Sequence, residues 1–119
     1  MKFIMLIKGP EAKNPPQALF DAIDGFIEEA GNKLVWTGGF NNSPTAAIAR
    51  PVRGKVQVTD GPFAEAKEVI GGFAVFDVAT REEALDWARR FVDLHIEHWP
   101  VWPMEVEMRE IFEAFPFRT

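Results

Sequence analysis

The sequence contains no cysteine, and this absence excludes several kinds of chemistry at once. Without cysteine there is no disulfide framework, no thiolate nucleophile and no thiolate-bound metal. A chain without disulfides suits a reducing compartment, so we expect a cytoplasmic protein.

Positive charge is also scarce. Thirteen Lys and Arg residues stand against eighteen Asp and Glu residues, which gives a net charge of −5, and no segment gathers basic residues. A protein that binds nucleic acid directly needs a basic surface to neutralise phosphates. We therefore expect no direct nucleic-acid partner.

Long apolar runs are missing as well. No run approaches the roughly 20 residues that cross a bilayer, so we expect no membrane partner. The apolar run at 3–7 ends at Lys8 and is not followed by a small-residue cleavage site, which does not suit a signal peptide. With 119 residues, the chain is expected to form a single domain, 1–119.

The hydrophobic pattern that is present predicts an α+β fold. Two segments, 3–7 and 72–78, are apolar on both alternating faces, which is typical of strands covered on both sides. Two others have helical spacing, and the second follows a capping box in which Thr80 precedes Glu83 by three residues. The predicted elements are a strand at 3–7, a helix at 16–30, a strand at 33–37 ended by Gly38 and Gly39, a hairpin of 45–50 and 55–59 with a loop of about four residues, a strand at 72–78, a helix after Thr80 and a strand at 104–109.

Apart from the extra hairpin, this order is the βαββαβ pattern of ferredoxin-like folds. We expect the first and third strands of that pattern, 3–7 and 72–78, to pair in parallel at the centre of the sheet. Both helices should cover one face of the sheet. No element is left for the second apolar face, so we expect another copy of the chain to pack there.

The segment that begins at Asp60 holds the main candidate site residues. Asp60 is either a turn residue that accepts backbone hydrogen bonds or a general acid or base in a pocket wall. Phe63, Glu65 and Lys67 follow it as candidate ligand-binding residues at the rim of that pocket, the alternative being a solvated face. Arg109 either pairs with the glutamates of its own strand or anchors an anionic ligand between subunits.

His95 and His98 are the two histidines of the chain. At a spacing of three residues they share a helix face, but no zinc signature accompanies them. We expect no metal and no other cofactor. His95 is retained as a candidate ligand-binding residue, against the alternative that the histidines pack on Trp99 and Trp102.

Asp60-Gly61-Pro62-Phe63-Ala64-Glu65-Ala66-Lys67-Glu68, followed by Gly71-Gly72-Phe73 and Glu83-Ala84-Leu85-Asp86-Trp87-Ala88, resembles the YCII-related family, in the branch called the DGPF domain. The likeness extends to 1–7 and 104–112 and so covers nearly the whole chain. It implies a bacterial, cytoplasmic protein whose ferredoxin-like subunits form a dimeric α/β barrel, in a family without a settled activity.

The resemblance also bears on the site. Some relatives are thought to use a His–Asp pair as an active site, with the histidine in the first helix. Asp60 is the counterpart of that aspartate. The predicted first helix of this chain, 16–30, contains no histidine. The partner of Asp60 would then be Arg109, Lys67 or one of the two histidines.

Two functions follow as alternatives. One is a homodimeric, cofactor-independent enzyme that performs acid/base chemistry on a small organic molecule, with Asp60 transferring the proton. The other is a non-catalytic ligand-binding or regulatory module in a transcription circuit, because relatives are sometimes associated with sigma factors. A cavity beside Asp60 with a second titratable group would favour the enzyme, and a filled, dry cavity with exposed apolar patches would favour the module.

Overall fold

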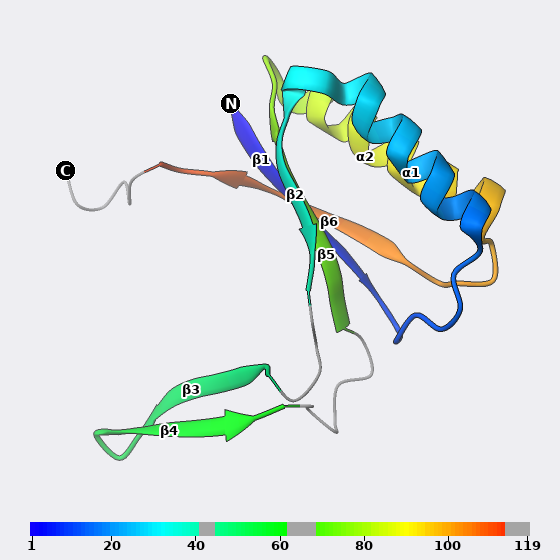
Figure 1. The fold of residues 1–119 in the computed structure, drawn as a ribbon. Helices are drawn as coiled ribbons and strands as arrows, with labels where there is room; N and C mark the ends of the chain where they lie inside the picture. Colours follow the sequence, from blue (N-terminus) through cyan, green and yellow to red (C-terminus); the bar gives the residue numbers. More distant parts are fainter. Residues whose placement is uncertain (41–44, 62–68, 114–119) are drawn as a thin grey trace.

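The computed structural model describes residues 1–40, 45–61 and 69–113. It confirms the α+β class, with two helices on one face of an antiparallel sheet (Figure 1). The elements are β1 (Lys2–Gly9), α1 (Gln17–Ala30), the 3₁₀ helix η1 (Gly31–Lys33), β2 (Leu34–Gly39), β3 (Ala47–Val52), β4 (Lys55–Asp60), β5 (Val69–Asp77), α2 (Arg81–His98) and β6 (Glu105–Ile111).

Four strands form the main sheet in the order β2-β5-β1-β6, and every neighbouring pair is antiparallel. The central position of β1 and β5 is as predicted, but their predicted parallel pairing is wrong, since Phe3 lies opposite Phe76 in an antiparallel register. The helical crossover leaves β1 and β2 running in the same direction. Because β5 enters between these two strands as an antiparallel neighbour of each, it must run against both.

The hairpin of β3 and β4 turns more tightly than predicted. The strands continue to Val52 and resume at Lys55, so Arg53 and Gly54 alone form the loop. Both residues have positive φ, 52° and 79°, as a type I′ turn requires. The predicted loop of about four residues is therefore wrong, because Pro51 and Val52 pair within the strand.

α2 begins where the capping box places it. The Thr80 hydroxyl accepts a hydrogen bond from the Glu83 backbone N–H at 3.1 Å, which satisfies one of the free donors of the first turn. α1 ends at Gly31, whose φ of 54° favours glycine.

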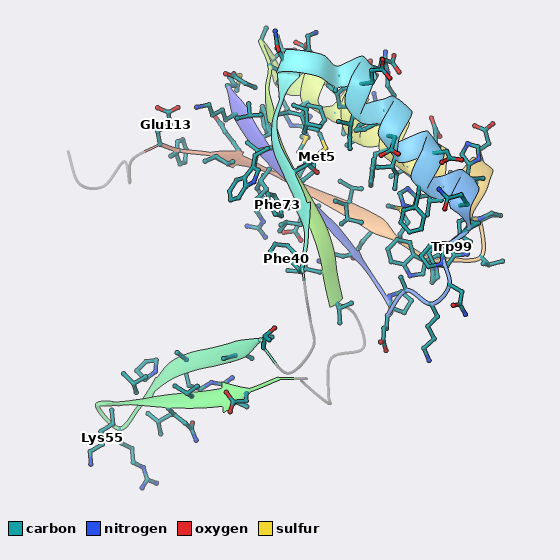
Figure 2. The ribbon with its side chains drawn as sticks, in the orientation of Figure 1. Met5, Phe40, Lys55, Phe73, Trp99 and Glu113 are labelled. Atoms are coloured by element: carbon teal, nitrogen blue, oxygen red, sulfur yellow. The ribbon has the colours of Figure 1, made fainter. Side chains whose placement is uncertain are left out.

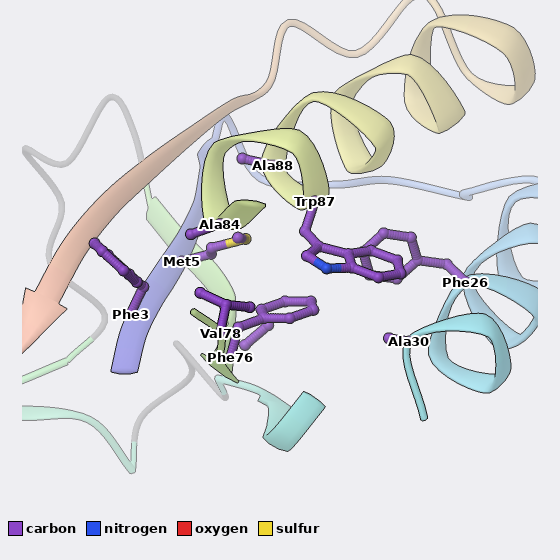
Figure 3. Close-up of a cluster of buried hydrophobic side chains, with 10 residues drawn as sticks. Phe3, Met5, Phe26, Ala30, Phe76, Val78, Ala84, Trp87 and Ala88 are labelled. Carbon is purple, nitrogen blue, oxygen red and sulfur yellow. The ribbon is translucent and has the colours of Figure 1, made fainter. Parts of the chain in front are cut away.

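The core lies between the two helices and the sheet (Figure 3). Phe76 of β5 is completely buried, and its ring stacks on Trp87 of α2 at 5.6 Å between centroids. Phe26 of α1 meets both rings edge to face, which ties the two helices to one strand. Burial of one phenylalanine side chain stabilises the fold by about 1.5–3 kcal/mol. These three aromatic side chains therefore contribute a large part of the free energy that holds the helices on the sheet.

The opposite side of the sheet, which we call the outer face, is also apolar. Ile4 and Leu6 alternate with the buried residues of β1, and they lie opposite Val75 and Phe73 of β5. Both described helices lie on the other side (Figure 1). The sequence therefore correctly indicated a second apolar face, and its burial by another copy remains a prediction.

Candidate functional site

A cavity of about 450 Å³ lies between α1 and the helix-covered face of the sheet. Its walls are mainly apolar side chains from both layers, and the segment after α2 contributes Trp99 and Trp102 to the lining. The lining includes Leu19 and Ile23 of α1, Ile7 and Phe76 of the sheet, Phe91 and His95 of α2, and Trp99 and Trp102.

Glycines leave the floor of this cavity open. Gly38 and Gly39 continue β2 beyond its predicted end, and Gly39 pairs with Gly72 of β5. A Cβ at Gly72 would lie 3.0 Å from the Gly38 carbonyl oxygen and 3.7 Å from Cδ1 of Ile7. Backbone crowding thus favours glycine at position 72. Without side chains here, the layer beneath α1 is left unfilled.

His95 supplies the one titratable side chain among the described residues that line the cavity. The residue is 4% exposed, and its Nδ1 lies 2.9 Å from the carbonyl oxygen of Phe91. A carbonyl only accepts hydrogen bonds, so Nδ1 carries the proton and Nε2 is the acceptor of the neutral ring. Burial lowers the pKa of His95, and the hydrogen bond to the Phe91 carbonyl raises it by a smaller amount. The pKa is therefore below its usual value, and the ring is neutral at neutral pH.

The Nε2 atom is the second ring nitrogen of His95. No residue in the described part of the chain donates to it, yet the described side chains include no fully buried nitrogen or oxygen without a partner. Since His95 lines the cavity and has almost no exposure elsewhere, Nε2 has access to the cavity space. It is a hydrogen-bond acceptor within a largely apolar wall.

Two tryptophans close the end of the cavity near the start of α1. Trp102 stacks on Trp99 at 5.3 Å and lies 5.8 Å from the His95 ring. Its indole N–H donates to the Pro10 carbonyl at 2.9 Å, and a Cβ at Gly9 would approach the indole to 2.9 Å. The segment after α2 is therefore bound to the end of β1, and both of its indoles line the cavity. Figure 2 shows Trp99 near the start of α1.

Among the described residues, the candidates Asp60 and Arg109 do not line this cavity. Asp60 is exposed at the end of β4, where the neighbouring Gly61 N–H donates to the Ala46 carbonyl. Phe63, Glu65 and Lys67 lie outside the described residues. Of the residues proposed for a pocket, His95 alone among those described lines this cavity, and the roles of all of them remain predictions.

Arg109 lies at the polar margin of the outer face. Its Nε donates to Glu107 at 2.6 Å, and Lys8 of β1 reaches the same carboxylate at 3.2 Å. Both cations lower the pKa of Glu107, and Arg109 has the larger effect. This is the pairing that the sequence offered as the default for Arg109.

The sequence patterns do not predict most of the cavity wall, which includes Leu19 and Ile23 of α1. The signal that could have located the cavity is the pair of double glycines, Gly38-Gly39 and Gly71-Gly72, on strands that become neighbours. No group of three or more His, Asp or Glu residues that could hold a metal occurs within 1–40, 45–61 and 69–113. Neither described helix is long and apolar enough to cross a membrane.

Comparison with known proteins gives two findings. The family model described as the YCII-related domain matches residues 1–105. A relative from Rhizobium meliloti (strain 1021), named "Uncharacterized protein R00369", is 52% identical over 48 residues. That match covers 39% of this chain and 39% of the relative's length.

Proposed function

The chain belongs to the YCII-related family, and from this premise we propose that it binds a small, mainly apolar organic molecule in the cavity beneath α1. The observation that carries the proposal is the buried neutral ring of His95 in a largely apolar wall. A cavity of about 450 Å³ is within the range of small-molecule sites, which combine apolar walls with few polar groups.

The walls also indicate the class of ligand. The lining in the described part of the chain includes no Lys, Arg, Asp or Glu, and a charged ligand would be costly to bury without a partner. Nε2 of His95 accepts one hydrogen bond. The ligand we propose is therefore uncharged, with an aromatic or aliphatic body and one hydroxyl or N–H donor.

A second function, acid/base catalysis without a cofactor, is supported by the same ring. A neutral imidazole whose Nδ1 is fixed by a carbonyl can take a proton at Nε2. The cavity in one protomer offers this single titratable group among the described residues, and Asp60 is exposed elsewhere. These two observations favour the ligand-binding module over the enzyme. A regulatory role in a transcription circuit that involves sigma factors is one form of such a module.

We also propose that the protein is a homodimer. The support is the outer face, where Trp36 is 66% exposed beside Phe73, at 4.8 Å between ring centroids. Phe40 lies against the same Phe73 ring at 5.3 Å (Figure 2). Exposed apolar surface of this kind marks an interaction site in soluble proteins.

Titration with 1-naphthol tests the binding proposal, and naphthalene is the matched ligand without the hydroxyl group. Trp99 and Trp102 line the cavity, so a bound naphthol should quench tryptophan fluorescence in a saturable way. The variant His95→Phe keeps a ring and removes the acceptor. We expect it to bind 1-naphthol about 10-fold more weakly, as loss of one hydrogen bond predicts, and to bind naphthalene as the parent does.

His98→Gln is the control variant, because His98 does not line the cavity. The proposal is wrong if the parent protein binds neither compound. It is also wrong if His95→Phe, once shown to be folded by circular dichroism, retains the parent's preference for naphthol over naphthalene.

A further inference from the structure

The β3–β4 hairpin stands apart from the rest of the protein. Its two strands pack extensively on each other, and neither packs extensively on another described helix or strand. Figure 1 shows it beyond the ends of β2 and β5, on the side away from the helices. The radius of gyration, 16.6 Å, exceeds the roughly 13.5 Å of a compact domain of this length, as a projecting arm requires.

The hairpin has one apolar face. The register places Ala49 opposite Val58 and Pro51 opposite Val56, so these four side chains share a face. Val56 is 77% exposed and Val58 is 61% exposed. The opposite face carries the pairs Arg50 with Gln57, Val52 with Lys55 and Ile48 with Thr59.

Such a hairpin is not self-sufficient. Two isolated strands are marginally stable in water, and they need a third strand or a packed face for stability. Here the face that could provide packing is in solvent, although its residues are among the best strand formers. Val56 and Val58 therefore offer an apolar surface that a partner could cover.

We propose that the hairpin is an inter-subunit arm whose apolar face docks on a second copy of this chain, against the aromatic patch of Trp36, Phe40 and Phe73. This inference rests on the proposed homodimer and adds the element that joins its subunits. Each copy carries both surfaces, the arm and the patch, so a twofold dimer pairs them twice and closes.

Charge also favours a second copy as the occupant. The hairpin strands and turn contain three basic residues, Arg50, Arg53 and Lys55, and one acid, Asp60, which gives +2. The whole chain carries −5, so the remainder carries −7. A basic arm is thus attracted to the acidic body of another copy, and complementary charge directs association.

Docking would change the surroundings of Asp60. This residue follows Val56 and Val58 at intervals of two on β4, so it lies on the apolar face of the arm. Its carboxylate is exposed in the protomer and would enter the interface with the arm. The Asp60 carboxylate of each subunit would then lie against the surface of the other subunit.

Analytical ultracentrifugation of full-length variants over a dilution series measures the dimer dissociation constant, and it tests whether the hairpin arm contributes to the dimer interface. Val58→Lys places a charge on the apolar face, and Thr59→Lys places the same charge on the opposite face of the same strand. Both side chains are exposed in the protomer, so neither change should alter its fold. We expect Val58→Lys to raise the dimer dissociation constant at least about 10-fold and Thr59→Lys to change it less than about 2-fold.

The outcomes separate the arm from the dimer. A monomeric parent protein would overturn both proposals, whereas a parent dimer that Val58→Lys leaves intact would overturn the arm alone. Because the chain has no cysteine, single cysteines give a second readout. Val58→Cys protomers mixed with Phe40→Cys protomers should be joined by a short bismaleimide, and Thr59→Cys protomers should be joined far less. Equal cross-linking from both positions would contradict the docked face.

Discussion

Among the single residues, His95 is buried, is hydrogen-bonded through Nδ1 and lines the cavity. Its ring lies between Phe91, at 4.7 Å, and Trp102, and a backbone carbonyl holds its protonated nitrogen. The same environment that keeps Nε2 available as an acceptor makes a proton on that atom costly. A pH dependence of stability follows directly.

Burial lowers the pKa of His95 in the folded protein below the value near 6.5 of the unfolded chain. The unfolded state therefore binds more protons, and the stability from neutral His95 is complete above about pH 6.5 and is lost as the pH falls toward the folded-state pKa. We expect the free energy of unfolding in urea to decrease between about pH 7.5 and pH 5.5.

His95→Phe should reduce this decrease, because phenylalanine binds no proton. His98→Gln should leave it in place, since the His98 ring is outside the buried cluster. An unchanged pH slope in His95→Phe would show that His95 does not carry the dependence.

At the scale of elements, α2 is the best specified part of the chain. Thr80 caps its first turn, and the Glu83 carboxylate accepts from the Ala79 backbone N–H at 3.1 Å and also pairs with Lys33. The hydrogen bond from Lys33 lowers the pKa of Glu83 most, and the hydrogen bond from the Ala79 N–H lowers it further. This carboxylate therefore stays ionised. The capping box therefore joins the start of α2 to the segment that precedes β2.

We expect Thr80→Ala to lower the free energy of unfolding by about 1 kcal/mol, because it removes the acceptor for the Glu83 N–H. Thr80→Ser keeps a hydroxyl and should change stability by only a few tenths of a kcal/mol. Urea unfolding followed by circular dichroism compares the two. Equal stability of the alanine and serine variants would mean that the cap contributes nothing.

At the scale of the whole molecule, the protein is a two-layer body with an apolar outer face and a projecting hairpin. Neither surface has a cover among the described helices and strands. The proposed dimer buries both, and it therefore makes folding and association parts of one equilibrium.

Coupled folding and association predicts a thermal midpoint that depends on protein concentration. For a dimer of this size, a hundredfold dilution should lower the midpoint by roughly 5 °C. Calorimetry at two concentrations measures the shift. A midpoint independent of concentration would be the behaviour of a monomer and would contradict the homodimer.

Local side-chain patterns were enough to predict several features of this fold. Alternation identified two strands that are apolar on both faces, helical spacing identified α1 and α2, and the Thr80–Glu83 spacing located a helix start. The long segment from Asp60 into β5 indicated the family that the comparison over 1–105 supports. These signals lie within short stretches of chain, so they do not depend on how distant segments pack.

The direction of pairing between β1 and β5 could not be read from local patterns, because it depends on where each crossover returns the chain. It also placed Gly38, Gly39 and Gly72 together beneath α1, and it brought His95 to the resulting cavity while leaving Asp60 exposed on a separate hairpin. Distances between these residues arise from the packing of two layers, which no local pattern encodes. The candidate site is therefore a property of the assembled layers, although each of its residues is visible in the sequence.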